Sequence, residues 1–132
     1  MAKKDLTYKG KTIEELKAMS LSEFMKYVPS RARRSLKRGF TDSQKKFMLK
    51  VKKFREGKTK KPVKTHCRDI VVTPELVGLV IHIHNGREFV PVEIVSEMLG
   101  RFLGEFAMTR KKVEHSAPGI GATKSSSAMS VK

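Results

Sequence analysis

The uneven distribution of charge along this chain is the feature that most constrains how it can fold. Residues 1–64 carry 21 Lys and Arg against 6 Asp and Glu, a net charge of +15. Residues 65–108 carry 3 against 6, a net of −3, and residues 109–132 carry 5 against 1, a net of +4. The sequence therefore predicts three parts: a basic helical region with a linker (1–64), an α+β core with a hairpin (65–108) and a basic Gly/Ser-rich tail (109–132), extended or disordered when free.

The total formal charge of +16 points to a polyanionic partner. A charge this one-sided repels itself in a free globule, and the few acids of residues 1–64 cannot neutralise it. Nucleic acid is the commonest polyanion, and an anionic membrane surface is the next. There is no run of ~18 apolar residues, which a membrane span needs, and the N-terminus lacks the apolar core of a signal peptide. The lone Cys67 fits a reducing cytosol, so we expect a cytoplasmic protein.

Cap residues and apolar spacing predict short helices in the basic region. Thr12, with Glu15 three residues later, has the pattern of a capping box, and apolar residues follow at helical spacing. A second short helical piece ends at Pro29. Residues 30–38 are a cationic stretch that ends at Gly39, a favourable residue for a helix C-terminus.

A longer helix is predicted next, and then a change of periodicity. Thr41 or Asp42 caps a helix from Ser43 to about Arg55. Residues 56–64 are polar and rich in helix breakers, which predicts a flexible basic linker. Residues 69–73 (D-I-V-V-T) form a short β-rich run.

A hairpin is predicted in the middle segment. Residues 79–84 (L-V-I-H-I-H) indicate a strand, Asn85-Gly86 is a favoured type I′ turn, and residues 87–92 return as the partner strand. Pro91 marks the returning strand as an edge or a short one, and residues 95–99 predict a brief helical turn. Burying each large aliphatic side chain contributes about 2 kcal/mol; those expected to face the core are Val71, Leu79, Ile81, Ile83, Val90 and Val92.

Candidates for catalysis or metal binding are weak. His82 and His84 lie two apart on the expected strand, so both point to one face and could in principle ligate a metal. His66 and Cys67 could be further ligands, but they do not have a recognised metal-ligand spacing. The favoured interpretation places the histidines on a solvent-exposed or RNA-facing side of the hairpin. The glycines of residues 119–122 follow no strand and open no helix, so no phosphate-binding fingerprint is supported. We expect no enzyme activity, no metal and no cofactor.

The basic residues favour contact with nucleic acid. Lys and Arg neutralise phosphates and release counterions, and Arg adds planar forks that bind phosphate and stack on bases. The residues selected on this ground are Arg31, Arg33, Arg34, Lys37, Arg38, Lys52 and Lys53, with Arg110, Lys111 and Lys112 in the tail. Three alternatives stay open: a free-standing nucleic-acid compactor, a metal-dependent hydrolase built on His82 and His84, and a protein bound to a membrane surface.

Four motifs of the middle segment resemble one family. K-T-H-C-R-D (64–69), V-T-P-E-L-V-G (72–78), H-N-G-R-E-F-V-P-V (84–92) and E-M-L-G-R-F-L-G-E-F (97–106) are similar in order and spacing to the ribosomal small-subunit protein S-nineteen family. Y-K-G-K-T-I-E-E-L (8–16), S-R-A-R-R-S-L-K-R-G (30–39) and H-S-A-P-G-I-G-A-T-K-S-S (115–126) resemble its archaeal and eukaryotic branch.

The resemblance implies a fold and a place. The fold is α+β: a small mixed three-stranded sheet with a β-hairpin packed against short helices, a basic helical N-terminal extension and an extended C-terminal tail. Such proteins bind small-subunit ribosomal RNA in the head of the subunit, beside the S-thirteen family protein, near the inter-subunit bridge and the tRNA sites. Matching residues are Lys64, Thr65, His66 and Arg68, Asn85 and Arg87 at the hairpin tip, and His115 and Lys124 in the tail.

Overall fold

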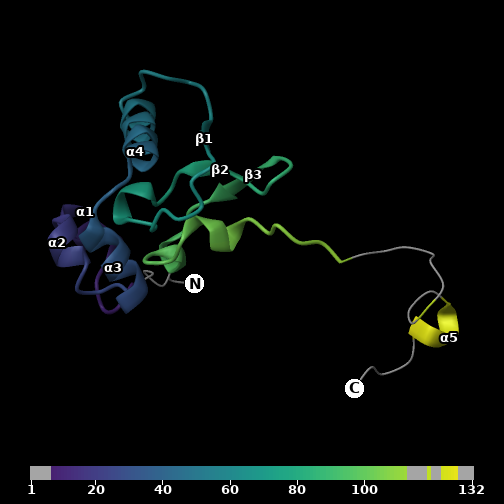
Figure 1. Cartoon of the computed structure of the whole chain (residues 1–132). Helices are drawn as coiled ribbons and strands as arrows, with labels where there is room; N and C mark the ends of the chain where they lie inside the picture. The colour runs from purple at the N-terminus through teal and green to yellow at the C-terminus, as the bar shows by residue number, and fades with distance from the viewer. Residues whose placement is uncertain (1–6, 113–118, 120–122, 128–132) are drawn as a thin grey trace, which may run out of the picture.

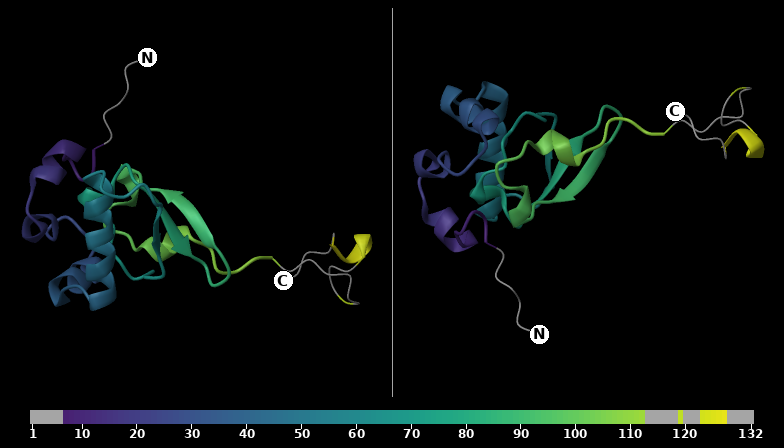
Figure 2. Two further views of the ribbon diagram at one scale, coloured as in Figure 1. Left: turned by 90° about the horizontal axis from the view of Figure 1, so that it is seen from above. Right: turned by 90° about the horizontal axis from the view of Figure 1, so that it is seen from below.

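The structure is a computed structural model of the chain, and it describes residues 7–112, 119 and 123–127. Figure 1 shows short helices gathered at one end of the molecule, a longer helix beside a small sheet, and a hairpin that projects toward the opposite end. The two views of Figure 2 show the same arrangement from above and below. Within the described residues no helix is long and apolar enough to span a membrane.

Local capping explains the first two helices, α1 (Ile13–Ala18) and α2 (Leu21–Phe24). The Thr12 hydroxyl accepts a hydrogen bond from the Glu15 amide at 3.3 Å, so the predicted helix start is confirmed. Ser20 begins α2 in a reciprocal capping box, in which Glu23 N donates to Ser20 Oγ and Ser20 N donates to Glu23 Oε2. The hydrogen bonds from Ser20 lower the pKa of the Glu23 carboxyl.

The second helical piece was predicted to end at Pro29, but α2 ends earlier, at Phe24. The next two helices, α3 (Ser30–Arg38) and α4 (Asp42–Arg55), follow the predicted boundaries. Gly39 ends α3 with a φ of 87°, a left-handed conformation that glycine adopts at little cost. Thr41 is the N-cap of α4, and it exchanges hydrogen bonds with Gln44. Gln44 is buried, and its Nε2 donates to Asp69 Oδ2 at 2.8 Å, which fixes the start of α4 against the middle segment.

The sheet has the predicted mixed topology. Strands β1 (Val63–Thr65), β2 (Val80–His84) and β3 (Phe89–Glu93) lie in the order β1-β2-β3. β1 pairs with β2 in parallel and β2 pairs with β3 antiparallel. The prediction that the strand containing Pro91 lies at an edge is confirmed, because β3 has β2 on one side only.

The first strand lies outside the segment where a β-rich run was predicted. Residues 56–64 were predicted to form a flexible linker. The end of this segment is instead part of a strand, because residues 63–65 pair with β2. The prediction of a β-rich run at residues 69–73 was wrong, because these residues form no strand. Val72 N donates to Arg101 O and Leu103 N donates to Ile70 O, which leaves one isolated bridge, Val71 to Phe102. Ile70, Val71 and Val72 are all buried. This apolar segment therefore runs through the core, and it is not a strand with one buried and one exposed face.

The connection between β2 and β3 is also different from the predicted type I′ turn. That turn needs a positive φ at Asn85, but the only described non-glycine residue with positive φ is Lys9. Pairing ends at His84 with Phe89, and Asn85 N donates to Glu88 O. The Asn85 side chain supplies the turn instead, because its Oδ1 accepts from both Arg87 N and Glu88 N at 2.9 Å.

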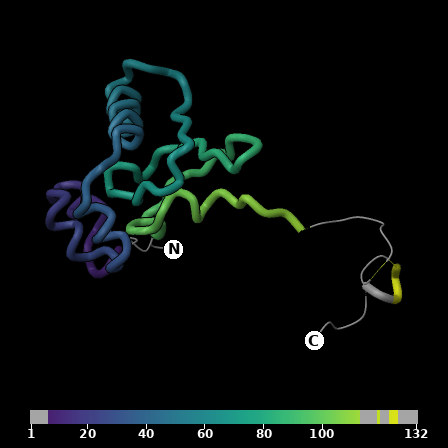
Figure 3. Tube along the Cα trace, in the orientation of Figure 1, coloured from purple at the N-terminus to yellow at the C-terminus, as the bar shows by residue number. Residues whose placement is uncertain are grey.

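The helices and the sheet share one hydrophobic core. Among the expected core side chains, Val71, Ile81, Ile83 and Val92 are buried, and Leu79 and Val90 are partly buried. Helix residues fill the same core, namely Leu16, Phe24, Ala32, Leu36, Phe47 and Val51, together with Val28 from the loop between α2 and α3. The predicted turn of residues 95–99 is confirmed as a 3₁₀ turn, Ser96–Met98. Figure 3 traces the chain from this turn beneath the sheet and out along residues 107–112, on the side toward which the hairpin projects.

Gly100 lies where the N-terminal segment packs against the end of this turn. Its φ is +75°, and a Cβ there would meet Tyr8 Oη at 2.8 Å, Val28 Cγ1 at 3.1 Å and Pro29 Cδ at 3.2 Å. Tyr8 Oη donates to Tyr27 O, and burial raises the pKa of its phenol while the nearby Arg101 charge opposes that shift. The packing of Tyr8, Val28 and Pro29 against residue 100 therefore needs a glycine for two reasons. The positive φ favours glycine, and a Cβ atom would not fit.

We expect Gly100→Ala to lower the free energy of unfolding by about 2–4 kcal/mol, from left-handed strain plus crowding. Urea unfolding of the full chain measures this loss. Gly39→Ala is the matched control, because its φ of +87° imposes strain while nothing lies within 4 Å of the added Cβ. Equal losses for the two variants would contradict the crowding argument.

Candidate nucleic-acid interface

The register of the sheet gathers polar and aromatic side chains on one face. Lys64 lies opposite His82, which lies opposite Pro91, and His84 lies opposite Phe89. Their neighbours in the strands, Val63, Thr65, Ile81, Ile83 and Val92, are buried on the other face. Because successive strand residues alternate between faces, the exposed face carries the lysine, the histidines and the phenylalanine together.

Three rings on this face form a cluster, which we call the ring cluster: His66, His84 and Phe89. The His66 and His84 ring centroids are 4.4 Å apart, and both rings meet Phe89 edge-on, at 5.0 Å and 4.9 Å. Lys64 Nζ lies 5.3 Å from the Phe89 centroid. Partly exposed rings beside a cation are suited to stack on bases and to hold a phosphate near them.

The hairpin tip beside the ring cluster has a fixed backbone. His84 Nδ1 accepts from Gly86 N at 3.0 Å, so the ring proton of a neutral His84 is on Nε2. Asn85 Oδ1 holds the next two amides. Arg87 is exposed on this support, and its backbone amide is held by the Asn85 side chain.

Lysines from α4, the following loop and β1 line a hollow next to the sheet. The hollow has a volume of about 440 Å³ and lies between the C-terminal half of α4, the following loop and β1. We call it the lysine hollow, because Lys50, Lys53, Lys61 and Lys64 line it together with Thr59, Pro62 and Val63. Lys64 belongs to both the lysine hollow and the exposed sheet face, so the two surfaces are continuous.

The predicted arginines of α3 do not all have the same surroundings. Arg31, Arg34, Lys37 and Arg38 are exposed. Arg33 is exposed too, but its guanidinium donates to Met25 O at 3.0 Å, Lys26 O at 3.4 Å and Val28 O at 3.2 Å. Arg33 therefore satisfies carbonyls at the end of the α2 segment, a structural role that the sequence analysis missed.

Two residues of the 64–69 motif point inward. Thr65 is 5% exposed, and its Oγ1 accepts from Cys67 N at 3.0 Å. Arg68 is partly buried, and its guanidinium donates to three backbone carbonyls, His84 O at 2.8 Å, Gly104 O at 2.5 Å and Ala107 O at 2.6 Å. These contacts give both side chains structural roles, and contact of either with RNA stays a prediction.

The remaining predicted residues are spread over the surface. Lys53 lines the lysine hollow, whereas Lys52 borders a different groove between the helices. Arg110, Lys111 and Lys112 are exposed in the segment that leaves the core on the hairpin side (Figure 3). Lys124 begins the short helix α5 (Lys124–Ser127), and His115 lies outside the described residues.

Positive charge in this surface is left without acidic partners. The ion pairs of the described residues join Lys11 to Glu15, Lys45 to Asp42, Lys58 to Glu56 and Arg101 to Glu105. None of them uses a lysine of the lysine hollow or Arg87. Within the same residues no group of three His, Cys, Asp or Glu could hold a metal ion. The arrangement is thus suited to bind phosphates and bases.

Lys50, Lys61, His84 and Phe89 were not among the selected site residues. Lys50 and Lys53 are three apart on a helix, so their shared face could have been found from the sequence. Phe89 was counted only as a strand residue. Its place beside His66 depends on the pairing of three strands, which no local pattern specifies.

Comparisons with known proteins agree with the motif resemblance. The sequence model of the family described as Ribosomal protein S19 matches residues 34–115. The small ribosomal subunit protein uS19 of the archaeon Saccharolobus solfataricus is 52% identical over 130 residues, which cover 98% of this chain and 93% of that protein.

We expect Arg68→Lys to lower the free energy of unfolding by about 2–4 kcal/mol, because an ammonium cannot reproduce the planar fork and leaves carbonyls unsatisfied. Urea unfolding of the full chain checks this expectation. Arg87→Lys, at an exposed position, is the control and should unfold as the parent chain does. Unchanged stability of Arg68→Lys would show that the three hydrogen bonds contribute little.

Proposed function

This chain belongs to the ribosomal protein S19 family, and from that premise we propose that it binds small-subunit ribosomal RNA through one continuous surface. This surface runs from the lysine hollow, across Lys64 and the ring cluster, to Arg87 at the hairpin tip. The observation that carries the proposal is the convergence of four lysines from α4, the following loop and β1 beside partly exposed rings.

Family membership defines the coarser role. The chain is a structural, non-enzymatic component of the small ribosomal subunit, and as a ribosomal protein it belongs to the cytoplasm. The predictions of a ribosomal protein and of no enzyme activity are thereby confirmed. The metal-dependent hydrolase that was left open on His82 and His84 has no support from this family.

The mechanism we propose is architectural. Lysines of the hollow neutralise phosphates that approach each other where the RNA backbone folds, and they release bound counterions. The ring cluster stacks on an unpaired base, a contact that regular duplex does not offer. Arg87 adds a planar donor fork on a rigid turn. The RNA thereby keeps one local tertiary arrangement.

The finer location follows the family motifs. We place the protein in the head of the subunit, beside the S-thirteen family protein and near the inter-subunit bridge and the tRNA sites. The support is the resemblance of residues 64–106 and 115–126 to the family pattern. The exposed Arg110, Lys111 and Lys112 would carry the tail away from the core along RNA.

We expect the combined variant Lys50→Ala, Lys53→Ala and Lys61→Ala to weaken binding to a structured small-subunit ribosomal RNA fragment. Each lost phosphate contact should reduce the slope of log affinity against log salt by about 1. A filter-binding titration from low to high salt measures the slope. Lys17→Ala, on the exposed surface of α1, is the single-charge control and should change it little. An unchanged slope for the triple variant would remove the lysine hollow from the interface.

We expect Phe89→Ala to weaken binding to the same RNA by about 1–3 kcal/mol, the usual contribution of base stacking, while the salt slope stays the same. Val80→Ala is the control, because Val80 is an exposed residue of β2 outside the ring cluster. Binding of duplex DNA should be insensitive to Phe89→Ala. Equal loss on duplex DNA and RNA would instead favour a general nucleic-acid compactor.

A further inference from the structure

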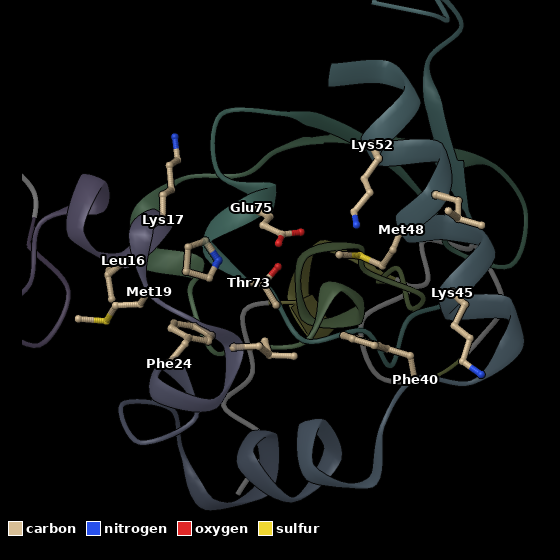
Figure 4. Close-up of a pocket in the computed structure, with 13 residues that line it drawn as sticks. Leu16, Lys17, Met19, Phe24, Phe40, Lys45, Met48, Lys52, Thr73 and Glu75 are labelled. Atoms are coloured by element: carbon tan, nitrogen blue, oxygen red, sulfur yellow. The ribbon is translucent and has the colours of Figure 1, made fainter. Parts of the chain in front are cut away.

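An apolar groove lies on the other side of α4 from the lysine hollow. It has a volume of about 410 Å³ and lies between α1, α2 and α4, over the 3₁₀ turn Pro74–Leu76. Figure 4 shows Met19 and Phe24 on one side and Phe40 and Met48 on the other, with Thr73 between them. We call it the helix groove.

Large apolar side chains remain exposed around the helix groove. Leu49 of α4 is 58% exposed and Leu21 of α2 is 39% exposed, and both line the groove. Met19 and Met48 line it as well, and methionine adapts its shape to different partners. Exposed apolar side chains that gather from separate elements indicate an interaction site rather than incidental exposure.

The charge around the helix groove is positive. Lys17, Lys45 and Lys52 line it, and Glu75 is the acidic residue among its lining. In Figure 4 the lysine side chains extend from opposite sides, Lys17 from α1 and Lys45 and Lys52 from α4. A partner with acidic side chains beside apolar ones would complement both features.

A buried hydroxyl lies at the floor of the helix groove. Thr73 is 3% exposed, and its Oγ1 has no hydrogen-bond partner among the described residues. Figure 4 shows Thr73 between the two walls of the groove, with its oxygen on the side of Glu75. An unpaired buried hydroxyl has a free-energy cost, which a polar group of an occupant would relieve after a small movement of the floor.

We propose that the helix groove binds an acidic segment of another protein, whose apolar side chains fill the groove between α2 and α4. RNA fits less well, since its phosphates would meet the lysines but leave the leucine and methionine walls without a partner. The chain's own tail carries a net charge of +4, and a second copy would bring +16, so both would be repelled by the rim. The partner is therefore an acidic, partly apolar protein segment.

The first test is a binding titration with the full-length chain in ~0.15 M salt, where screening reduces unspecific attraction. The probe is a fluorescent 15-residue peptide with leucines at helical spacing on one face and glutamates on the other. A second peptide has the same glutamates and serine in place of leucine. We expect Leu49→Ser to weaken binding of the leucine peptide about fivefold, through lost apolar contact. Met108→Ser, at a residue 76% exposed outside the groove, should bind as the parent does.

The serine peptide measures only the attraction of acidic residues to a basic chain. It should bind with the same affinity to the parent chain, to Leu49→Ser and to Met108→Ser. Equal binding of both peptides, or no effect of Leu49→Ser, would overturn the proposal. A second test uses small subunits assembled with the full chain carrying Leu49→p-benzoylphenylalanine and then irradiated. A crosslink to an acidic segment of a neighbouring protein supports the proposal, whereas a crosslink to ribosomal RNA, or none, overturns it.

Discussion

The hydrogen bonds of Arg68 hold together three segments that are far apart in the chain. Its guanidinium donates to carbonyls 16, 36 and 39 residues away, at the end of β2 and on both sides of the exit of the C-terminal segment. A lysine has one donor centre and could not span them. Gly104 is part of the same constraint, because a Cβ there would meet Arg68 O at 3.0 Å and Arg68 Cβ at 2.9 Å. The placement of the hairpin tip and of the exposed basic segment after Ala107 therefore depends on one partly buried cation.

The parts of the fold that local chemistry determines could be predicted from the sequence. Thr12 and Thr41 begin helices because a hydroxyl satisfies an amide three residues on, and this pattern is visible in the sequence. Strand β1 was missed because Val63 follows a proline among lysines, and only the parallel pairing with β2 makes it a strand. The predicted type of the turn after His84 was wrong for a related reason. Its Asn-Gly pair fits a type I′ turn, but the Asn85 side chain offers its backbone a competing arrangement.

The candidate site divides in the same way. Charge alone predicted a polyanionic partner, and it selected Arg31, Arg34 and Lys53, whose side chains are exposed. Charge could not separate Arg33, which binds backbone carbonyls, from its exposed neighbours, because both have the same local pattern. The ring cluster needed the register of three strands, and no single segment contains that information. Sequence thus identifies which residue types are abundant, while long-range pairing decides which of them meet.

Helix α4 faces three different environments. A helix turns about 100° per residue, so residues three or four apart share a face. Gln44, Phe47 and Val51 are buried in the core, Lys50 and Lys53 line the lysine hollow, and Lys45, Met48, Leu49 and Lys52 line the helix groove. Phe47 and Met48 are neighbours in the sequence, yet Phe47 is buried in the core and Met48 lines the helix groove. A helix used only for RNA binding would need no exposed Leu49. Leu49 is exposed beside Met48 and the lysines of the helix groove. This exposure is explained when the helix groove binds a protein and the lysine hollow binds phosphate.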